Sequence, residues 1–320
     1  MIVFVTTPGQ QHTVSSLGQF GRPLPIIKVA TYDRLLERGD LPNATLIFTD
    51  IERLPHWELQ LAAEMYRAAA KAGIKCLNDP ARVMARYELL RSLYLAGHNP
   101  FNVYRADESA MPRRFPVFIR RESDHGNPIS SLILSQQDLT GALAECGRCG
   151  IPLRGLLIVE FCAEPIADGI WRKFGTFRVG EEMVVDHAVL QDTWHAKNGK
   201  IADYPDVLFQ EEHDAVVANH FAAELRPAFD LAHIEFGRAD HSLVGRRQVV
   251  YEINTNPNIG GPEPQRSPIR AKSRAFAMDH LAHSLRAIDS GDGSPIPIEP
   301  GPLLIRYRQL NSGLNWPCRP

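Results

Sequence analysis

One segment of the chain has the pattern of a strand in its first half and of a loop in its second half: residues 249–261, VVYEINTNPNIGG. The first half is apolar and β-branched, whereas the Asn-Pro-Asn run ends any strand and the two glycines loosen the chain that follows. Glu252 and Asn254 interrupt the apolar half, and side chains two positions apart in a strand project to the same face of the sheet. The segment therefore predicts a strand that presents a carboxylate and an amide oxygen side by side shortly before it ends.

The strand expected before this segment carries a second acidic residue. It contains the sequence FGRAD, and a hairpin between the two strands would bring Asp240 opposite Glu252. Two carboxylates and one amide oxygen on adjacent strands suit one or two Mg²⁺ ions that bridge a polyphosphate, because hard cations take oxygen ligands and retain phosphate oxygens as further ligands. The residues alone leave a second interpretation open, in which Glu252 is a solvated strand residue and Asn254 begins a turn.

Strand and helix patterns alternate at the start of the chain. Three short apolar strand-like segments come first, followed by a helical pattern over residues 56–73 and a further strand over residues 74–78. Strand, loop, helix and strand in this order predict a small parallel α/β domain over residues 1–77.

The rest of the chain mixes helices with strand pairs. A helix is expected over residues 79–97, with Asn78 or Asp79 as its cap and Pro80 in its first turn. Further helices are expected over residues 135–150, 211–230 and 267–289. A strand that ends in a polar, glycine-containing loop is expected over residues 115–128, and further strands over residues 155–164, 169–191 (an antiparallel pair), 232–240 and 249–257. We expect one domain over residues 78–288 and a loosely held, Gly- and Pro-rich tail over residues 289–320.

The composition excludes several classes of protein. The 320 residues are 44% hydrophobic and 22% charged with a net charge of −2, which argues against a nucleic acid or an anionic membrane as the main partner. The first residues lack a cationic leader, and the five cysteines fit a reducing compartment, so we expect a cytoplasmic protein. Cys146 and Cys149 form a CxxC pair that closes a predicted helix and has no second ligand pair, which favours an incidental pair. The twelve histidines, His187 among them, are spread out and are expected to be structural or at the surface.

The two strands with the acidic residues resemble the metal-binding strands of the ATP-grasp ligases, the superfamily of D-alanine–D-alanine ligase and glutathione synthetase. Those ligases have Gly-Arg-x-Asp, a hairpin and then Glu-x-Asn-x-x-Pro, and this chain has GRAD followed by EINTNP. The resemblance implies an α/β (α+β) protein with an ATP-grasp fold behind an N-terminal parallel α/β domain. It also implies Asp240, Glu252 and Asn254 as Mg²⁺ ligands, and Arg238 as the cation that faces the reacting acyl centre.

The segment LLIVEFCAE resembles the hinge strand that holds adenine between the two ATP-grasp subdomains. The resemblance implies adenine contacts for Glu160, Phe161 and Cys162. A nearby acid in these ligases usually binds the ribose hydroxyls, and both Glu164 and Asp168 are candidates that spacing does not separate.

Arginines occupy positions where the resemblance leads one to expect lysines. The segment FPVFIRRESDHG resembles the strand before the phosphate-covering loop, and it has Arg120 where a phosphate-binding lysine is usual. The helix after Asn78 likewise has Arg82 and Arg86 as its basic residues. Arginine retains the charge and can bind two phosphate oxygens, but its geometry differs from that of lysine.

Three further cations follow the hinge-like strand. Arg172 and Lys173 lie in a strand pair that resembles that of peptide-ligase-like members, and Lys197 falls where those ligases have a γ-phosphate lysine. For each of these three residues, an exposed surface charge remains an equally open interpretation.

What the resemblance implies is an ATP- and Mg²⁺-dependent ligase that activates a carboxylate as an acyl phosphate for attack by an amine, a thiol or a similar nucleophile. Its partners would be ATP and a small-molecule or peptide carboxylate–amine pair, and a homodimer is compatible with these expectations. Two alternatives stay open: a degenerate nucleotide-binding or regulatory protein, which the missing lysines favour, and a kinase-like member that stops at a phosphorylated product.

Overall fold

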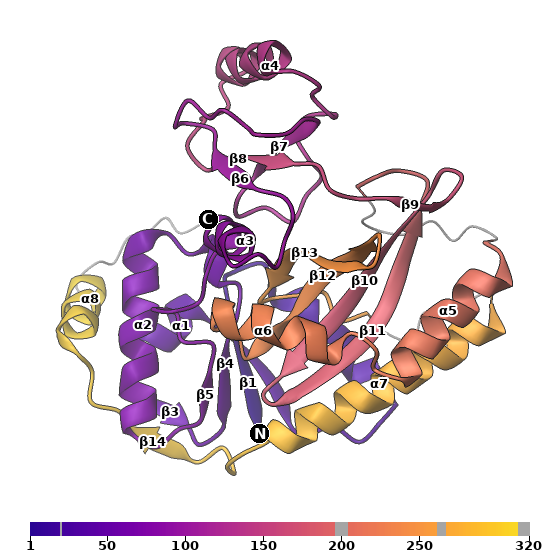
Figure 1. The fold of residues 1–320 in the computed structure, drawn as a ribbon. Helices are drawn as coiled ribbons and strands as arrows, with labels where there is room; N and C mark the ends of the chain where they lie inside the picture. The colour runs from indigo at the N-terminus through magenta and orange to yellow at the C-terminus, as the bar shows by residue number, and fades with distance from the viewer. Residues whose placement is uncertain (20, 196–203, 261–266, 313–320) are drawn as a thin grey trace.

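The N-terminal part of the chain folds into a parallel sheet with a helix packed against it (Figure 1). The computed structural model describes residues 1–19, 21–195, 204–260 and 267–312, so the predicted role of Lys197 lies outside the described residues. The strands of this sheet lie in the order β2–β1–β4–β5 and pair in parallel: β1 Ile2–Thr6, β2 Ile27–Thr31, β4 Thr45–Phe48 and β5 Cys76–Leu77. α2 (His56–Lys71) packs on this sheet, and the predicted parallel α/β unit is confirmed.

Short elements connect these strands: η1 Gln11–Gln19, α1 Tyr32–Leu36, β3 Asp40–Pro42 and η2 Ile51–Arg53. The sequence patterns did not separate these short elements from loops, because each is too short to show a period.

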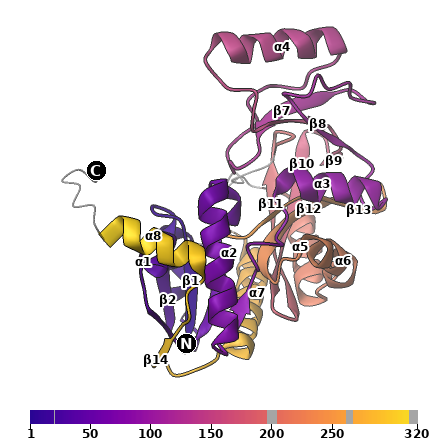
Figure 2. The ribbon, with the colours of Figure 1, turned by 90° about the vertical axis from the view of Figure 1, so that its left-hand side faces the viewer.

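A small antiparallel sheet with one helix stands apart from the rest of the molecule in both views (Figures 1 and 2). Its order is β6–β8–β7, and its elements are β6 Val103–Arg105, β7 Val117–Arg121, α4 Gln136–Arg148 and β8 Leu156–Glu160. The side chain of Ser135 caps α4 by accepting a hydrogen bond from the backbone nitrogen of Asp138 at 3.1 Å. We refer to this unit as the small sheet.

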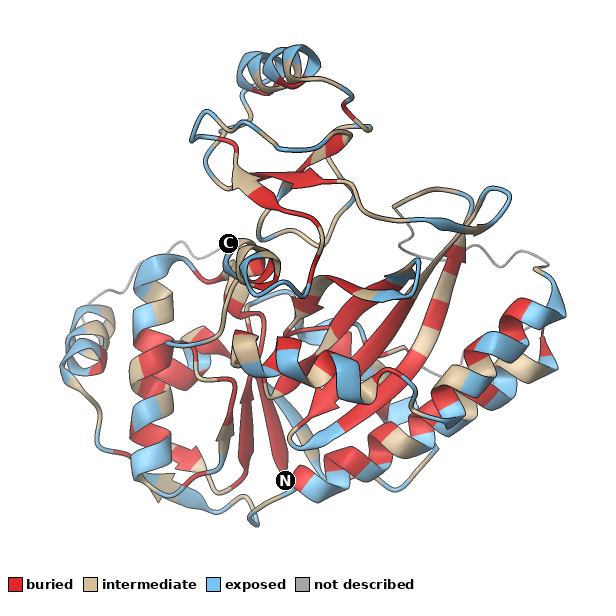
Figure 3. Ribbon diagram, in the orientation of Figure 1, coloured by how far each residue is buried: buried red, intermediate tan, exposed pale blue. Residues whose placement is uncertain are grey.

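A larger antiparallel sheet, the large sheet, forms the centre of the molecule. Its order is β11–β10–β12–β13, with β9 paired to β10: β9 Pro165–Ala167, β10 Ile170–Val179, β11 Glu182–Gln191, β12 Phe236–Val244 and β13 Arg247–Asn254. Three helices pack on one face: α3 Arg86–Leu95, α5 Asp206–Val217 and α6 Ala222–Ala232. Figure 3 shows that the central strands are largely buried, so this sheet is a rigid base for side chains on its other face.

The long helix α7 (Pro268–Ile288) joins the large sheet to the N-terminal sheet. Leu281 of α7 lies in one hydrophobic cluster with Phe4 of β1 and Phe177 of β10. Because this core is shared, the division of the chain at residue 77 stays a prediction. In the described ranges, no helix combines the length and the apolar character that crossing a membrane requires.

The helix predicted over residues 79–97 begins later than expected, at Arg86. Asn78 does not cap it, because its side-chain amide donates to the carbonyl oxygens of Phe48 and Phe236 at 3.0 and 2.7 Å, and its oxygen accepts from the backbone nitrogen of Phe236. Asn78 thus connects β4 to β12 with a φ of 64°. A contact between residues so far apart in sequence was not visible in the local pattern. The other predicted cap, Asp79, accepts from the backbone nitrogen of Ala81 at 2.9 Å but lies well before Arg86, so neither residue caps α3.

The single helix predicted over residues 211–230 is two helices, α5 and α6. The chain turns at Asn219, which has a φ of 50°. The side chain of Asn219 accepts from the backbone nitrogen of Val185 at 3.0 Å and donates to the carbonyl of Met183 at 2.8 Å, so the turn is fixed to β11.

The segment after α7 is not a loosely held tail over its described part. β14 (Pro295–Pro297) pairs with β3, and α8 (Pro302–Ser312) buries Leu304 in the core around α2. Glycine and proline content predicted mobility, but the chain here is held by pairing to the N-terminal unit.

Candidate active site

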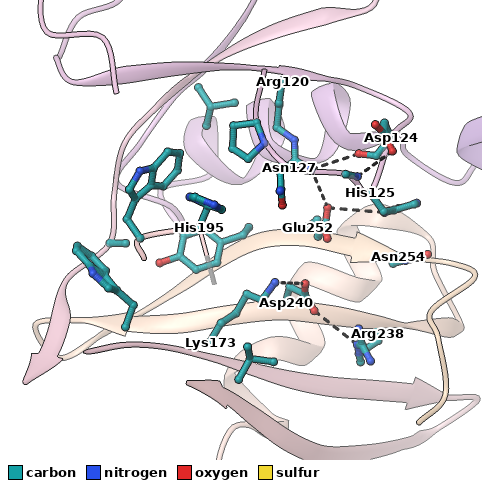
Figure 4. Close-up of a pocket in the computed structure, with 18 of the residues that line it drawn as sticks. Arg120, Asp124, His125, Asn127, Lys173, His195, Arg238, Asp240, Glu252 and Asn254 are labelled. Carbon is teal, nitrogen blue, oxygen red and sulfur yellow. Dashed lines mark hydrogen bonds and ion pairs between the residues drawn. The ribbon is translucent and has the colours of Figure 1, made fainter. Parts of the chain in front are cut away.

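A cavity of about 850 Å³ opens between the small sheet and the large sheet (Figure 4). Its floor is one face of the large sheet, one wall is the chain at residues 159–163 where β8 ends, and the loop at residues 124–128 covers it. Three parts of the chain that are distant in sequence therefore enclose one space.

Four positions form a row across the floor of the cavity. His187 of β11 pairs with Gly175 of β10, Gly175 pairs with Asp240 of β12, and Asp240 pairs with Glu252 of β13. The predicted hairpin that brings Asp240 opposite Glu252 is confirmed. Arg238 lies opposite Asn254 on the same two strands, and both residues line the cavity.

The floor contains two β-bulges at this row. One lies between Asp240 and His241, so that Tyr251 of β13 has no partner in the register, and the other makes Asp186 of β11 the additional residue opposite β10. A bulge redirects the side chains next to it and is frequent beside active sites. The hydroxyl of Tyr251 donates to the carbonyl of Cys162 at 3.0 Å, which connects the floor to the hinge.

Glu252 is surrounded by cations. Its Oε2 forms an ion pair with Arg86 and lies 3.5 Å from Nη2 of Arg120 and 3.9 Å from Nδ1 of His125. Burial alone would raise the pKa of Glu252, but Arg86, His125 and Arg120 outweigh it and hold the pKa well below its usual value. Glu252 is therefore ionised at neutral pH.

Arg86 supports the covering loop and does not line the large cavity. Its Nη1 donates to the carbonyl oxygens of Arg121, Glu122 and Asp124 at 3.0, 2.6 and 2.9 Å. This basic residue lines a smaller cavity of about 130 Å³ behind Glu252. Arg120, in contrast, lines the large cavity, and burial lowers its pKa to about 10.

His125 connects the covering loop to the N-terminal unit, a contact that the sequence did not indicate. Its Nε2 lies 2.8 Å from Oε1 of Glu52, while Nδ1 faces Glu252. Burial lowers the pKa of His125, but Glu252 and Glu52 outweigh this effect and raise the pKa to about 9. The imidazolium thus bridges two carboxylates and holds the loop over the floor.

Asp240 lies between two cations on the floor (Figure 4). Nζ of Lys173 donates to its Oδ2 at 2.7 Å, and Nε of Arg238 lies 3.6 Å from its Oδ1. Lys173 is therefore at the site and is not an exposed surface charge. Arg172, the neighbouring cation, forms an ion pair with Glu211 at 2.5 Å.

The oxygen atoms of Asp240, Glu252 and Asn254 fit a Mg²⁺ ion that is also bound by phosphate. All three residues line the cavity, and Asn254 Oδ1 accepts from the backbone nitrogen of Asn256 at 2.8 Å, which fixes its amide. Over the ranges that the structure describes, no group of three or more His, Cys, Asp or Glu side chains could hold a metal ion. Mg²⁺ needs only one or two carboxylates when phosphate and water complete its shell, so this donor set suits such an ion and not one held by protein alone.

Aromatic side chains line the cavity where β8 ends, and we call them the hinge wall: Phe118, Phe161, Trp171 and Trp194. Ring centroids are 6.0 Å apart for Phe161 and Trp171, 5.6 Å for Phe161 and Trp194, and 4.9 Å for Phe118 and Trp194. Such a wall suits a planar aromatic ligand. The sequence indicated Phe161 alone, because the other three rings come from β7, β10 and the chain after β11.

The three acidic residues near the end of β8 differ in burial and in their hydrogen-bond partners. Glu160 is buried and its carboxylate accepts from the backbone nitrogen of Asn102 and the hydroxyl of Tyr104, both at 2.9 Å. Asp168 is exposed in the turn between β9 and β10, and Glu164 accepts from the backbone nitrogen of Gly245 at 2.7 Å. Neither Asp168 nor Glu164 is among the described residues that line the cavity.

Arginines form another part of the lining of the cavity, which we call the cationic end: Arg238, Arg270 and Arg274. Arg270 and Arg274 project from the first turns of α7, and Arg270 donates to the carbonyl of Ala188 at 3.0 Å. Arg274 forms an ion pair with Asp186, and Nη1 of Arg238 lies 4.0 Å from the same carboxylate. The sequence did not indicate Arg274, because α7 meets β11 only in the folded chain.

No family model and no curated protein matches the sequence. The fold is similar to that of D-alanine–D-alanine ligase from Bacillus anthracis complexed with ATP, with a TM-score of 0.52 and 11% identity over 97% of this chain and 99% of that chain. A second structure of that ligase gives a TM-score of 0.51 and 13% identity over the same shares. The chain has the ATP-grasp fold. The predicted fold class, a mixed α/β protein with an N-terminal parallel sheet, is thereby confirmed.

The structure brings most of the predicted site residues to one cavity of this ATP-grasp fold. The predicted residues that line it are Arg120, Glu160, Phe161, Cys162, Arg172, Lys173, Arg238, Asp240, Glu252 and Asn254. Arg86 lies behind Glu252, and Asp168 lies in the exposed turn before β10. The roles of these residues remain predictions.

Proposed function

We propose that the protein is an ATP- and Mg²⁺-dependent ligase that activates a carboxylate as an acyl phosphate for attack by an amine or a similar nucleophile. The observation that carries this proposal is the register of Asp240 and Glu252 on adjacent strands, with Lys173 and Arg120 beside them in one cavity. Paired carboxylates with facing cations are what binding and transfer of a phosphoryl group require.

In this proposal the parts of the cavity lining have different tasks. The hinge wall and residues 160–162 hold adenine, and Arg120 and Lys173 bind the phosphates. Asp240, Glu252 and Asn254 would hold Mg²⁺, which when bound neutralises charge on the transferring phosphoryl group. Arg238 donates to the oxyanion that forms when the nucleophile attacks the acyl phosphate.

The substrates would be ATP and a small-molecule or peptide carboxylate–amine pair, in the cytoplasm. The net charge of −2 supports small-molecule partners, since no excess of positive charge would attract nucleic acid.

A second candidate function is a nucleotide-binding protein without ligation. The arrangement of Glu252 favours it, because Arg86, Arg120 and His125 already neutralise this carboxylate. For ligation, a bound Mg²⁺ would have to share Glu252 with these cations.

Trapping with hydroxylamine separates the two functions without knowledge of the amine. The purified protein is incubated with ATP, Mg²⁺, hydroxylamine and a panel of L- and D-amino acids and dicarboxylic acids, and both ADP and hydroxamate are measured. A ligase gives equal amounts of ADP and hydroxamate with a particular acid, and Glu252→Gln gives neither above background. Nucleotide binding by calorimetry without either product would support the second function, and ADP without hydroxamate would indicate a kinase-like reaction.

A further inference from the structure

A pair of side chains at the cationic end has no task in the mechanism above. Asp186 and His187 are consecutive on β11, and Nδ1 of His187 lies 2.5 Å from Oδ2 of Asp186. Asp186 is buried, whereas the side chain of His187 is 20% exposed and lines the cavity. A buried carboxylate that supports a half-buried imidazole at a cavity is an arrangement that orients histidine for proton transfer.

The bulge in β11 is what brings these two neighbours together. Consecutive strand residues normally point to opposite faces, but Asp186 is the additional residue between the pairs His187–Gly175 and Val185–Thr176. His187 therefore stays in the row with Gly175 and Asp240, and its strand lies two strands away from the strand of Asp240. At about 4.8 Å per strand, its backbone lies roughly 10 Å from that of Asp240. This spacing leaves room for a reacting centre between them.

The surroundings fix the tautomer of His187. Burial would raise the pKa of Asp186, but Arg274, His187 and Arg238 outweigh it and hold the pKa far below its usual value, so Asp186 is an anion. Nη1 of Arg274 also lies 3.2 Å from Nδ1 of His187, yet the anionic oxygen at 2.5 Å is closer and accepts the Nδ1 proton. In the neutral imidazole the lone pair is then on Nε2, for which the described part of the chain shows no hydrogen bond.

The proposed reaction needs such a lone pair. An amine is largely protonated at neutral pH and cannot attack the acyl phosphate until its proton has been removed. The other histidines that line the cavity are less suited to remove it: His125 bridges Glu52 and Glu252 as a cation, His12 is exposed, and His195 lies beside Trp194 in the hinge wall, with ring centroids 5.1 Å apart.

We propose that Nε2 of His187 is the general base of the second half-reaction, an inference that rests on the proposed ligase function. His187 takes a proton from the ammonium group of the nucleophile, and the freed electron pair forms the C–N bond at the acyl carbon. The C–O bond to phosphate breaks, and phosphate leaves with the electrons of that bond. The nitrogen loses its second proton to the leaving phosphate and becomes an amide nitrogen. His187 then releases its proton to water. Asp186 acts as a positioning residue that holds Nδ1 protonated.

Hydroxylamine separates this step from formation of the acyl phosphate, because it is largely uncharged at neutral pH and needs no base. Two reactions are compared, both with ATP, Mg²⁺ and the acid that gives a hydroxamate. One contains hydroxylamine as the nucleophile, and the other contains the amino acid that gives a condensation product. For His187→Gln we expect hydroxamate formation within a few-fold of wild type, while condensation with the amino acid falls by roughly a hundredfold or more. Added imidazole should restore part of the condensation rate in His187→Ala.

Matched variants keep the test specific. His12→Gln, at an exposed histidine of the cavity, and His283→Gln, at an exposed histidine of α7 outside it, should leave the ratio of condensation to hydroxamate unchanged. Asp186→Asn should lower that ratio, because the amide no longer requires a proton on Nδ1.

The outcomes separate this inference from the function on which it rests. If wild type forms no hydroxamate from any acid, the ligase function and the role of His187 both fail. If wild type forms hydroxamate but His187→Gln loses hydroxamate and condensation in equal measure, or loses neither, the ligase function stands and the general-base role is wrong.

Discussion

The hinge wall and the cationic end are two parts of the lining of one cavity, and they are built in different ways. The hinge wall is a set of aromatic rings with ring-centroid distances of 4.9 to 6.0 Å, whereas the cationic end is a group of arginines around the buried carboxylate of Asp186. Aromatic surface binds a ligand equally in its ground state and its transition state, while fixed charges stabilise charge that develops during a reaction. The comparison therefore predicts that changes at the hinge wall alter affinity and that changes at the cationic end alter turnover.

The largest effect is expected for Arg238→Ala. Loss of a donor to the oxyanion should lower kcat by roughly a hundredfold or more, with little change in the dissociation constant of ATP. Steady-state kinetics and calorimetry measure the two quantities. Arg246→Ala, in the exposed hairpin turn between β12 and β13, is the control. A kcat within a few-fold of wild type would remove Arg238 from the mechanism.

Gly175→Ala should give the next largest effect, also on kcat. A Cβ at residue 175 would lie 3.0 Å from Cδ of Arg238, so the arginine must shift. A displacement of this kind should lower kcat by about tenfold or more without loss of ATP binding. Gly141→Ala in α4, where a Cβ meets nothing within 4 Å, should leave kcat unchanged. Equal kinetics for the two variants would show that the position of Arg238 does not matter.

Trp194→Ala tests the hinge wall. Loss of one stacking surface should weaken ATP binding by about tenfold, the scale for a base stacked on an aromatic ring, and leave kcat at saturating ATP nearly unchanged. Trp57→Ala, an exposed tryptophan of α2, is the matched control in a calorimetric titration. A fall in kcat with unchanged affinity would break the distinction between the two parts of the lining.

The smallest effect concerns stability and pH at the cationic end. The pKa of Asp186 in the folded protein lies below its ordinary value of 3.8, so its stabilising contribution is complete above that pH and is lost as the pH falls. When the pH falls from 7 to 3, the free energy of unfolding of the wild type should decrease by about 1 kcal/mol through Asp186, and Asp186→Asn should lack this decrease. Urea unfolding at both pH values measures this difference. Asp279→Asn, at an exposed ion pair with Arg22, should behave as wild type does.

The sequence predicted some parts of the site and not others, and the reason is physical. The pairing of Asp240 with Glu252 followed from strand alternation and a short hairpin, which are both local properties. The contact of Arg274 with Asp186 joins residues 88 positions apart. It also depends on the bulge in β11, which no residue pattern predicts. His125 and Glu52 are 73 positions apart and meet only because the loop after β7 reaches the N-terminal unit in the folded chain.

Secondary structure shows the same limit. The long periodic helices α2 and α7 were predicted well, because their apolar faces repeat over several turns. The start of α3 was predicted wrongly, since Asn78 has the residue type of a cap but its hydrogen bonds go to β4 and β12. Local signals place an element, whereas tertiary contacts decide where it begins.

The central claim, that a carboxylate attacks ATP, is tested most directly by the fate of carboxylate oxygen. The acid identified by hydroxamate formation is labelled with oxygen-18 in its carboxyl group and incubated with the wild-type protein, ATP, Mg²⁺ and the amine. The released phosphate is then analysed by mass spectrometry. If an acyl phosphate forms, each phosphate carries one labelled oxygen from the acid. Phosphate without label, released at the same rate as ADP, would mean that water and not the carboxylate attacks ATP, and it would contradict the account.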